Sequence, residues 1–170
     1  MKYTTFLLPL AVAGGLLLSA FAPAKPASPL HCQVPCGIYG DSTRITMMLE
    51  DITTIEKGMK SIVELEGAET KNYNQIVRWV SNKDEHAQNI QDTVAAYWLA
   101  QRIKAPKGGE EGARAKYLKQ LELMHGLTVS AMKCKQTTDL SHVESLRHLT
   151  QAFAETYFSK EDLDHMKGHH

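Results

Sequence analysis

The sequence predicts an all-α protein, an antiparallel four-helix bundle preceded by an irregular N-terminal segment. Three observations favour this fold class. Apolar residues recur every three or four positions in four long stretches, the connections between these stretches are short, and no stretch alternates apolar and polar residues as a half-buried strand does. A chain of 170 residues, of which 43% are hydrophobic, is also long enough to bury one core.

The charge balance and the missing motifs exclude several classes of function. Lys and Arg together number 19, as do Asp and Glu, so no basic field favours nucleic acid, and we expect no nucleic-acid partner. The sequence contains no phosphate-binding loop, dinucleotide fingerprint or nucleophile elbow. Enzyme classes built on these motifs are therefore disfavoured.

Residues 1–22 have the features of an export signal. Lys2 gives a positive start, an apolar run follows from residue 6 to residue 18, and Ala20-Phe21-Ala22 matches a small-residue cleavage site. The run is shorter than the roughly 20 residues that a membrane span needs, although an uncleaved anchor is the alternative. Residues 23–30 are rich in proline and predict an accessible linker or pro-segment. The mature protein is then expected in the periplasm or outside the cell, without stable membrane association.

The first two helices are predicted from their caps and their apolar spacing. The first follows a turn at Gly40-Asp41-Ser42, which holds an N-cap candidate, and ends near Gly67. The second begins after Asn72, with Gln75 placed for a capping box, and ends before Pro106. Their predicted inward positions are Ile45, Met48, Leu49, Ile52, Ile55, Met59, Ile62, Val63, Ile76, Val77, Val80, Ala87, Ile90, Val94, Tyr97 and Trp98.

The third helix is predicted over about residues 111–135, and the fourth begins at a capping box, Ser141-x-x-Glu144. Together the four helices define a bundle domain over residues 41–158, followed by a flexible tail over residues 159–170. The predicted inward positions of the third and fourth helices are Tyr117, Leu118, Leu121, Met124, Leu127, Ala131, Cys134, Val143, Leu146, Leu149, Phe153 and Tyr157.

Residues 31–39, HCQVPCGIY, show no helical pattern and hold two of the three cysteines. If the mature chain began at His31, its amine, its imidazole, the Cys32 amide and two thiols would lie within six residues. Nitrogen donors in a tetragonal site suit Ni(II) or Cu(II), and thiolates add strongly donating ligands. Pro35 and the glycine after Cys36 supply the turn that brings the second thiol back to the same ion.

The pattern His-Cys-x-x-Pro-Cys-Gly-x-Tyr resembles the nickel hook of nickel-containing superoxide dismutases. The resemblance implies that residues 31–40 form this hook at the N-terminus of the mature chain, and that a processing protease frees the His31 amine. It implies Ni(II) bound by that amine, the Cys32 amide nitrogen and the thiolates of Cys32 and Cys36, with the His31 imidazole binding axially in Ni(III). Tyr39 would then stand over the open face.

The resemblance implies an enzyme that converts two superoxide ions and two protons to dioxygen and hydrogen peroxide while nickel alternates between Ni(III) and Ni(II). It also implies one nickel ion per subunit and a homohexamer. Two alternatives remain open. The same ligands suit a non-catalytic exported carrier of nickel or copper, and a Cys32–Cys36 disulfide suits a purely structural helical bundle.

The resemblance also points to residues around the hook, where Pro35 shapes the turn. His86 lies near the position of a family arginine that supports the axial histidine. Lys104 is similar to a family lysine that helps to draw superoxide inward. The family's acidic partner in the first helix falls near Thr46, which offers only a hydroxyl. For His86 and Lys104 the alternative is a solvated surface position.

The remaining candidates are interpreted as structural. Cys134 lies between two lysines, which would lower its pKa, but a single helical cysteine is more often a packed thiol. His165 and His169 have metal-binding spacing for a helix, yet they stand in a terminal segment, where we expect fraying and adventitious binding at most. The large aromatic residues are expected in the core or in an interface: Trp79, Tyr97, Trp98 and Phe153.

Overall fold

The computed structural model describes residues 40–167, and the side chains of residues 40–164. Every regular element in this range is a helix, which confirms the predicted all-α fold class. None of the helices in this range has the length and apolar character needed to cross a membrane. The elements are α1 (Asp41–Gly67), α2 (Tyr73–Asp92), the π-helix η2 (Thr93–Arg102), α3 (Glu111–Gln136), α4 (Ser141–Tyr157) and α5 (Lys160–Lys167).

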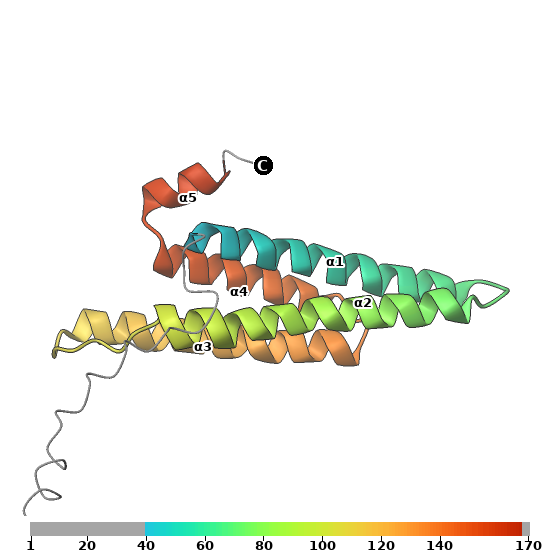
Figure 1. Ribbon diagram of the computed structural model, residues 1–170, viewed down its shortest axis with the longest axis horizontal. Helices are drawn as coiled ribbons and strands as arrows, with labels where there is room; N and C mark the ends of the chain where they lie inside the picture. Colours follow the sequence, from blue (N-terminus) through green and yellow to red (C-terminus); the bar gives the residue numbers. More distant parts are fainter. Residues whose placement is uncertain (1–39, 168–170) are drawn as a thin grey trace, which may run out of the picture. The chain divides into compact units, whose positions relative to one another are not determined.

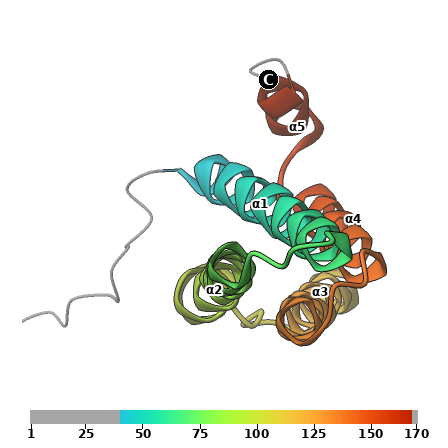
Figure 2. The same ribbon diagram turned by 90° about the vertical axis from the view of Figure 1, so that its right-hand side faces the viewer.

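Four long helices form an antiparallel bundle (Figure 1), and η2 continues α2 without a break. Helix α1 lies beside α2, α3 lies beside α4, and α4 returns next to α1 (Figure 2). The start of α1, the end of η2, the start of α3 and the end of α4 meet at one end of the bundle, which we call the hook end. The α1–α2 and α3–α4 connections lie toward the other end, which we call the far end.

The core is filled by apolar faces that the sequence predicted. Trp98 is fully buried and packs edge-to-face on Tyr97, Phe153 and Tyr157, with ring centroids 4.8–5.1 Å apart. The predicted core residues that are buried come from all four helices: Ile45, Met48, Ile52, Ile55, Met59, Ile62, Ala87, Ile90, Val94, Tyr97, Trp98, Met124, Leu127, Ala131, Cys134, Val143, Leu146 and Phe153.

Several predicted inward positions are exposed. Val77 on α2 is 62% exposed, and Val80, Val63 and Leu118 are exposed as well. In Figure 1 the pair of α1 and α2 extends beyond the α3–α4 connection, so the first turns of α2 have only α1 to pack against. The apolar spacing identified the helices correctly but overestimated the width of their buried faces.

Helix capping follows the predictions in part. The Asn72 side-chain oxygen accepts a hydrogen bond from the Gln75 backbone N–H (3.2 Å), which confirms the predicted start of α2. The predicted capping box at Ser141 is wrong, because Ser141 is already helical and its N–H donates to Asp139 Oδ1 (2.9 Å). At the start of α1 the N-cap is Gly40, with φ at 77° and no side-chain cap, so the predicted cap there is also wrong.

The π-helix η2 was not predicted from the sequence. Its hydrogen bonds join each N–H to the carbonyl five residues earlier, and Ile103 N–H continues this pattern by donating to the Trp98 carbonyl (2.9 Å). Side chains five positions apart are thereby brought toward one face, whereas in an α-helix the neighbours are three and four apart. Helix α5 is a second addition, since it occupies part of the segment predicted to be a flexible tail.

A buried lysine joins α2 to the end of α3. Lys83 is 3% exposed, and its ammonium group donates to the carbonyl oxygens of Cys134 (2.6 Å) and Lys135 (2.9 Å) and to Asp84 Oδ1 (2.7 Å). Both carbonyls belong to the last turn of α3, where a cation complements the helix dipole. On α1, Gly58 leaves room for the lysine stem, because a Cβ there would lie 3.2 Å from the Lys83 Cβ.

Candidate metal centre

The predicted metal ligands precede the first described residue. The predicted signal (1–22), the linker (23–30) and the hook residues His31, Cys32, Pro35, Cys36 and Tyr39 all lie outside the described residues. Gly40 follows Tyr39 directly, and the four residues from Cys36 to Gly40 can span no more than about 14 Å. The structure therefore describes the end of the bundle to which the predicted hook is attached.

A polar cluster at this end surrounds the carboxylate of Asp41, the first residue of α1. Tyr157, at the end of α4, donates its hydroxyl to Asp41 Oδ2 (2.5 Å). Arg102, at the end of η2, donates Nε to the same oxygen (3.1 Å) and also donates Nη2. Tyr97, on η2, donates its hydroxyl to Oδ1. With the Asp41 side chain only 12% exposed, one shielded carboxylate joins the start of α1 to two other helices.

The cluster fixes the charge state of its members. Burial disfavours the charged form of Asp41, but hydrogen bonds from Arg102, Tyr157 and Tyr97 outweigh burial and hold its pKa below the usual value. Burial, reinforced by the hydrogen bond to the carboxylate, raises the pKa of Tyr97 to about 12 and also raises the pKa of Tyr157. Both phenols therefore stay protonated at neutral pH and serve as donors to an ionised Asp41.

Two buried donors near this cluster have no hydrogen-bond acceptor among the described residues. The Arg44 guanidinium lies over the Tyr97 ring, with Cζ 5.0 Å from the ring centroid, and its Nε is buried and unpaired. The indole Nε1 of Trp98 is likewise buried and unpaired. Buried donors normally have a partner, so the hook end holds hydrogen-bonding capacity that residues 40–164 leave unused.

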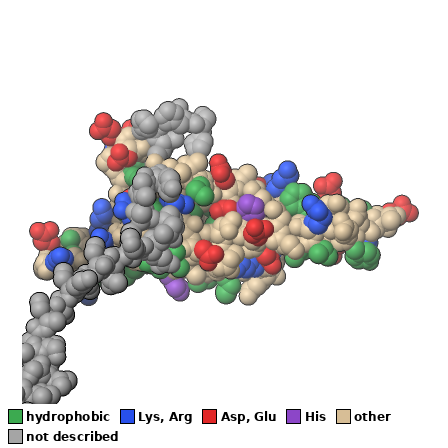
Figure 3. Space-filling model, viewed as in Figure 1, with side chains coloured by type: hydrophobic (Ala, Val, Ile, Leu, Met, Phe, Trp, Pro, Cys, Tyr) green, Lys and Arg blue, Asp and Glu red, His purple; other side chains and the backbone are tan. Residues whose placement is uncertain are grey.

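His86 lies in a pocket of about 450 Å³ between α1 and α2. Its Nδ1 is 2.6 Å from Asp51 Oδ1, and the same oxygen is 3.4 Å from Asn89 Nδ2. Because Asp51 engages Nδ1, Nε2 remains for another partner. Acidic side chains gather over α1 and α2 on this face (Figure 3). The pocket is lined by Met47, Glu50, Asp51, Thr54, His86, Asn89, Asp92 and Thr93.

Sequence reasoning missed Asp51 as the acidic partner of His86. It pointed to Thr46, whose hydroxyl instead donates to the Ser42 carbonyl within α1 (3.4 Å). The missed signal was the register of the helical hairpin, since Asp51 and His86 lie at comparable distances from the turn that joins α1 to α2. Residues so placed face one another when two helices pack antiparallel.

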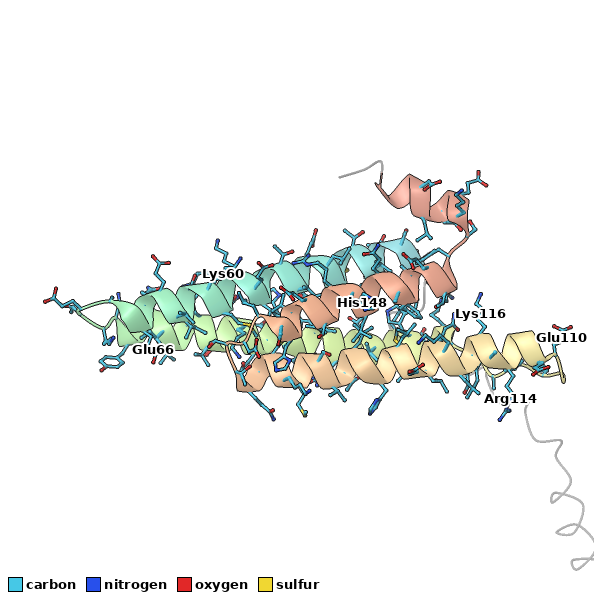
Figure 4. The ribbon with its side chains drawn as sticks, turned by 180° about the vertical axis from the view of Figure 1, so that it is seen from behind. Lys60, Glu66, Glu110, Arg114, Lys116 and His148 are labelled. Atoms are coloured by element: carbon cyan, nitrogen blue, oxygen red, sulfur yellow. The ribbon has the colours of Figure 1, made fainter. Side chains whose placement is uncertain are left out.

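Lys104 is exposed just beyond the end of η2, and therefore at the hook end. Arg114 and Lys116, from the first turns of α3, lie at the same end of the bundle (Figure 4). Basic side chains from two elements thus lie at the hook end, together with the acidic Glu110 and Glu111 at the start of α3.

The described residues hold no second candidate for a metal. Among residues 40–164, no three His, Cys, Asp or Glu side chains come together to hold an ion. Cys134 is fully buried, and burial raises its pKa to about 11 against the opposing charge of Lys83, so it is the packed thiol that was predicted. His165 belongs to α5 but its side chain is outside the described part, as is the whole of His169.

Fold and sequence together define a helical bundle with thiol and imidazole donors directly ahead of its first helix. The family model for nickel-containing superoxide dismutase matches residues 24–161, which include the predicted hook and all four bundle helices, α1 to α4. The chain belongs to the nickel-containing superoxide dismutase family, and it is accordingly an enzyme that dismutates superoxide with nickel rather than a carrier or a purely structural bundle. No curated protein and no solved structure matches the chain.

Proposed function

We propose that residues 31–40 hold the nickel ion of this superoxide dismutase, one per subunit, through His31, Cys32 and Cys36. The proposal is supported by where this segment lies in the sequence, because the family match includes it. Among residues 40–164, no three metal-binding side chains come together. The donor set fits nickel, because thiolates combined with amine and amide nitrogens are strong donors to Ni(II).

Each ligand has its own task in this proposal. The His31 amine, the Cys32 amide nitrogen and the thiolates of Cys32 and Cys36 would hold the ion, and the His31 imidazole would supply a further nitrogen donor. When bound, nickel supplies the redox couple, Ni(III)/Ni(II), that takes an electron from one superoxide ion and returns it to the next. Anionic sulfur and amidate donors favour the higher oxidation state, so Cys32 and Cys36 set the potential.

The residues around the predicted hook shape its turn, order anions or water beside the ion and attract superoxide. Pro35 shapes the turn between the two thiolates, and Tyr39 orders anions or water beside the ion without binding it. Lys104, together with the other basic side chains of the hook end, raises the local concentration of superoxide, which carries one negative charge.

His86 is proposed to hold the His31 imidazole in orientation. The Asp51 carboxylate engages His86 Nδ1 at 2.6 Å, which leaves Nε2 for the second ring. Asp51 stands ten residues along α1 from Asp41, or about 15 Å, and the nine residues from His31 to Gly40 can span up to about 30 Å. The chain is therefore long enough for His31 to reach this pocket.

Maturation and assembly complete the proposal. Residues 1–22 direct export to the periplasm or beyond, and a second protease removes the linker 23–30 and frees the His31 amine. The subunits form a homohexamer, which would cover apolar side chains that the single bundle leaves exposed: Val63, Tyr73, Val77 and Val80. N-terminal sequencing and light scattering of the protein from its own cells test both points, and an active, nickel-loaded protein that still carries the linker would contradict the first.

His31→Gln tests the ligand assignment. The variant keeps the terminal amine, the Cys32 amide and both sulfurs, so nickel should bind in unchanged stoichiometry. It lacks the axial imidazole, so superoxide decay should slow steeply. Full metal with near-normal decay would show that the axial assignment is wrong, and loss of metal would show that the ring is needed for binding itself.

A further inference from the structure

The start of α1 is held by tertiary hydrogen bonds rather than by a local cap. Its N-cap residue, Gly40, has no side chain, and no side chain of the described residues caps this end of the helix. The Asp41 carboxylate instead takes hydrogen bonds from Tyr97, Arg102 and Tyr157. The first turn of α1 is thereby fixed to the ends of η2 and α4, on two other sides of the bundle.

The π-helix explains how two of these donors reach one carboxylate. Tyr97 and Arg102 are five positions apart, a spacing that an α-helix turns to different faces. In η2 the hydrogen bonds run over five positions, so both side chains point toward the start of α1. Ten residues of π-helix are unusual, since this geometry commonly occurs as single turns and often at functional sites.

The cluster lies where it can act on the hook. Asp41 is five residues after Cys36, so the chain between them spans at most about 18 Å. Gly40, between the cluster and the hook, adopts φ of 77°, a conformation that favours glycine and sets the direction in which the chain leaves α1. The unpaired donors Arg44 Nε and Trp98 Nε1 lie on the same elements, α1 and η2.

We propose that Asp41 is a positioning residue of the nickel site, whose hydrogen bonds to Tyr97, Arg102 and Tyr157 fix where and in which direction the hook leaves the bundle. The inference rests on the proposed binding of nickel by residues 31–40. Asp41 touches neither metal nor substrate in this role. It acts by limiting the positions that the thiolate of Cys36 and the ring of Tyr39 can take.

Asp41→Asn tests this role in the nickel-loaded protein. Asparagine keeps the shape but loses the charge and one acceptor oxygen, while every proposed ligand stays in place. Nickel content should equal that of the wild type, the electron paramagnetic resonance spectrum of the oxidised protein should change, and superoxide decay should slow about tenfold, because small displacements of reacting groups are costly. The matched control is Glu56→Gln, which removes a carboxylate on α1 that pairs with Lys60 and Arg147. It should leave spectrum and rate unchanged.

Tyr157→Phe keeps the ring contacts with Trp98 and removes the hydroxyl that donates to Asp41 and also interacts with Arg102. It should change the spectrum in the same sense but less, and the effects of Tyr157→Phe and Asp41→Asn should be less than additive in the double variant. The inference would be overturned if both single variants kept the wild-type spectrum and rate and showed only a lower unfolding temperature. That outcome would not contradict the proposed nickel site. If Asp41→Asn does not fold, an unchanged Tyr157→Phe spectrum overturns the inference. Absence of nickel from the wild-type protein would instead overturn the site, and the inference with it.

Discussion

Two charged residues join helices of this bundle, the buried Lys83 toward the far end and the partly buried Asp41 at the hook end, and they do so with different partners. Lys83 donates to two backbone carbonyls in the last turn of α3 and to its neighbour Asp84. Among the described residues, Asp41 accepts only from side chains, those of the two tyrosines and the arginine of its cluster. Backbone carbonyls of a packed helix have little freedom to move, whereas long side chains adjust.

This difference in partners indicates different roles: Lys83 stabilises the fold, and Asp41 orients the proposed nickel site. Lys83 satisfies carbonyls that the end of α3 would otherwise leave unpaired, which is a requirement of folding alone. Asp41 ties together three elements at the point where the proposed hook joins the bundle. Loss of Lys83 should therefore affect stability, and loss of Asp41 should affect the metal site more than stability.

The largest effect on activity is expected when a thiolate of the predicted hook is removed while Lys83 and Asp41 are kept. Cys32→Ser or Cys36→Ser should each reduce superoxide decay to the background rate, because a hydroxyl is a much weaker donor to oxidised nickel than a thiolate. Helicity measured by circular dichroism should be unchanged, since the bundle core lies within α1 to α4. Retained dismutation in either variant would contradict the ligand assignment.

Cys134→Ala is the matched control for these two variants. It removes the third thiol of the chain, which is fully buried in the core. We expect a loss of about 1–2 kcal/mol in the free energy of unfolding from the small cavity, and an unchanged activity per bound nickel.

Of the variants compared, Lys83→Met should cause the largest loss in the free energy of unfolding while leaving activity per nickel unchanged. The variant keeps the apolar stem but leaves the carbonyls of Cys134 and Lys135 without their donor, which should lower the free energy of unfolding by about 1–3 kcal/mol. Activity per nickel should be that of the wild type. Denaturant unfolding measures the first and superoxide decay the second. Lys60→Met, at an exposed i,i+4 pair, should change stability by less than about 0.5 kcal/mol.

Local patterns predicted the fold well because helix periodicity and helix ends depend on residues that are close in the sequence. The bounds of α1 and α3 and the aromatic core around Trp98 follow from such spacing. The exposure of Val77 does not, because it depends on how far the α3–α4 pair extends along α2. The π-helix was missed because the apolar spacing of its residues also fits an α-helix, and only the five-residue spacing of its backbone hydrogen bonds distinguishes the two.

The ligand types of the proposed nickel site could be predicted from the sequence, but the packing of the residues near it could not. His31, Cys32 and Cys36 were recognisable because their donors lie close together in the chain, and they stay a prediction because they precede the described residues. The partners of Asp41 come from positions 56 to 116 residues away, so no local pattern reveals them. Asp51 beside His86 is a similar case, found only through the packing of two helices.

The loss of stability in acid should include a contribution from Asp41. Its folded-state pKa is held below the ordinary 3.8, so its contribution is fully present above that value and is lost as the pH falls through the lower folded pKa. In the metal-free protein, the difference in unfolding temperature between wild type and Asp41→Asn should be constant near neutral pH and shrink below about pH 4. A difference that persists undiminished at lower pH would mean that the shape of the aspartate, rather than its charge, holds the cluster.

The smallest effect on the rate of superoxide decay is expected when a surface charge is removed. A pair of lysine variants, one at each end of the bundle, tests this. Lys104→Gln removes an exposed lysine just after η2, at the hook end. Lys60→Gln removes an exposed lysine toward the far end (Figure 4). If superoxide is consumed at the hook end, only Lys104→Gln should slow its decay, by about two- to threefold at low ionic strength. The difference should fade as salt rises beyond about 0.1 M, where the screening length is about 10 Å. Equal slowing in both variants would show that net charge alone attracts superoxide, and a salt-independent loss in Lys104→Gln would show that Lys104 acts through contact rather than through its field.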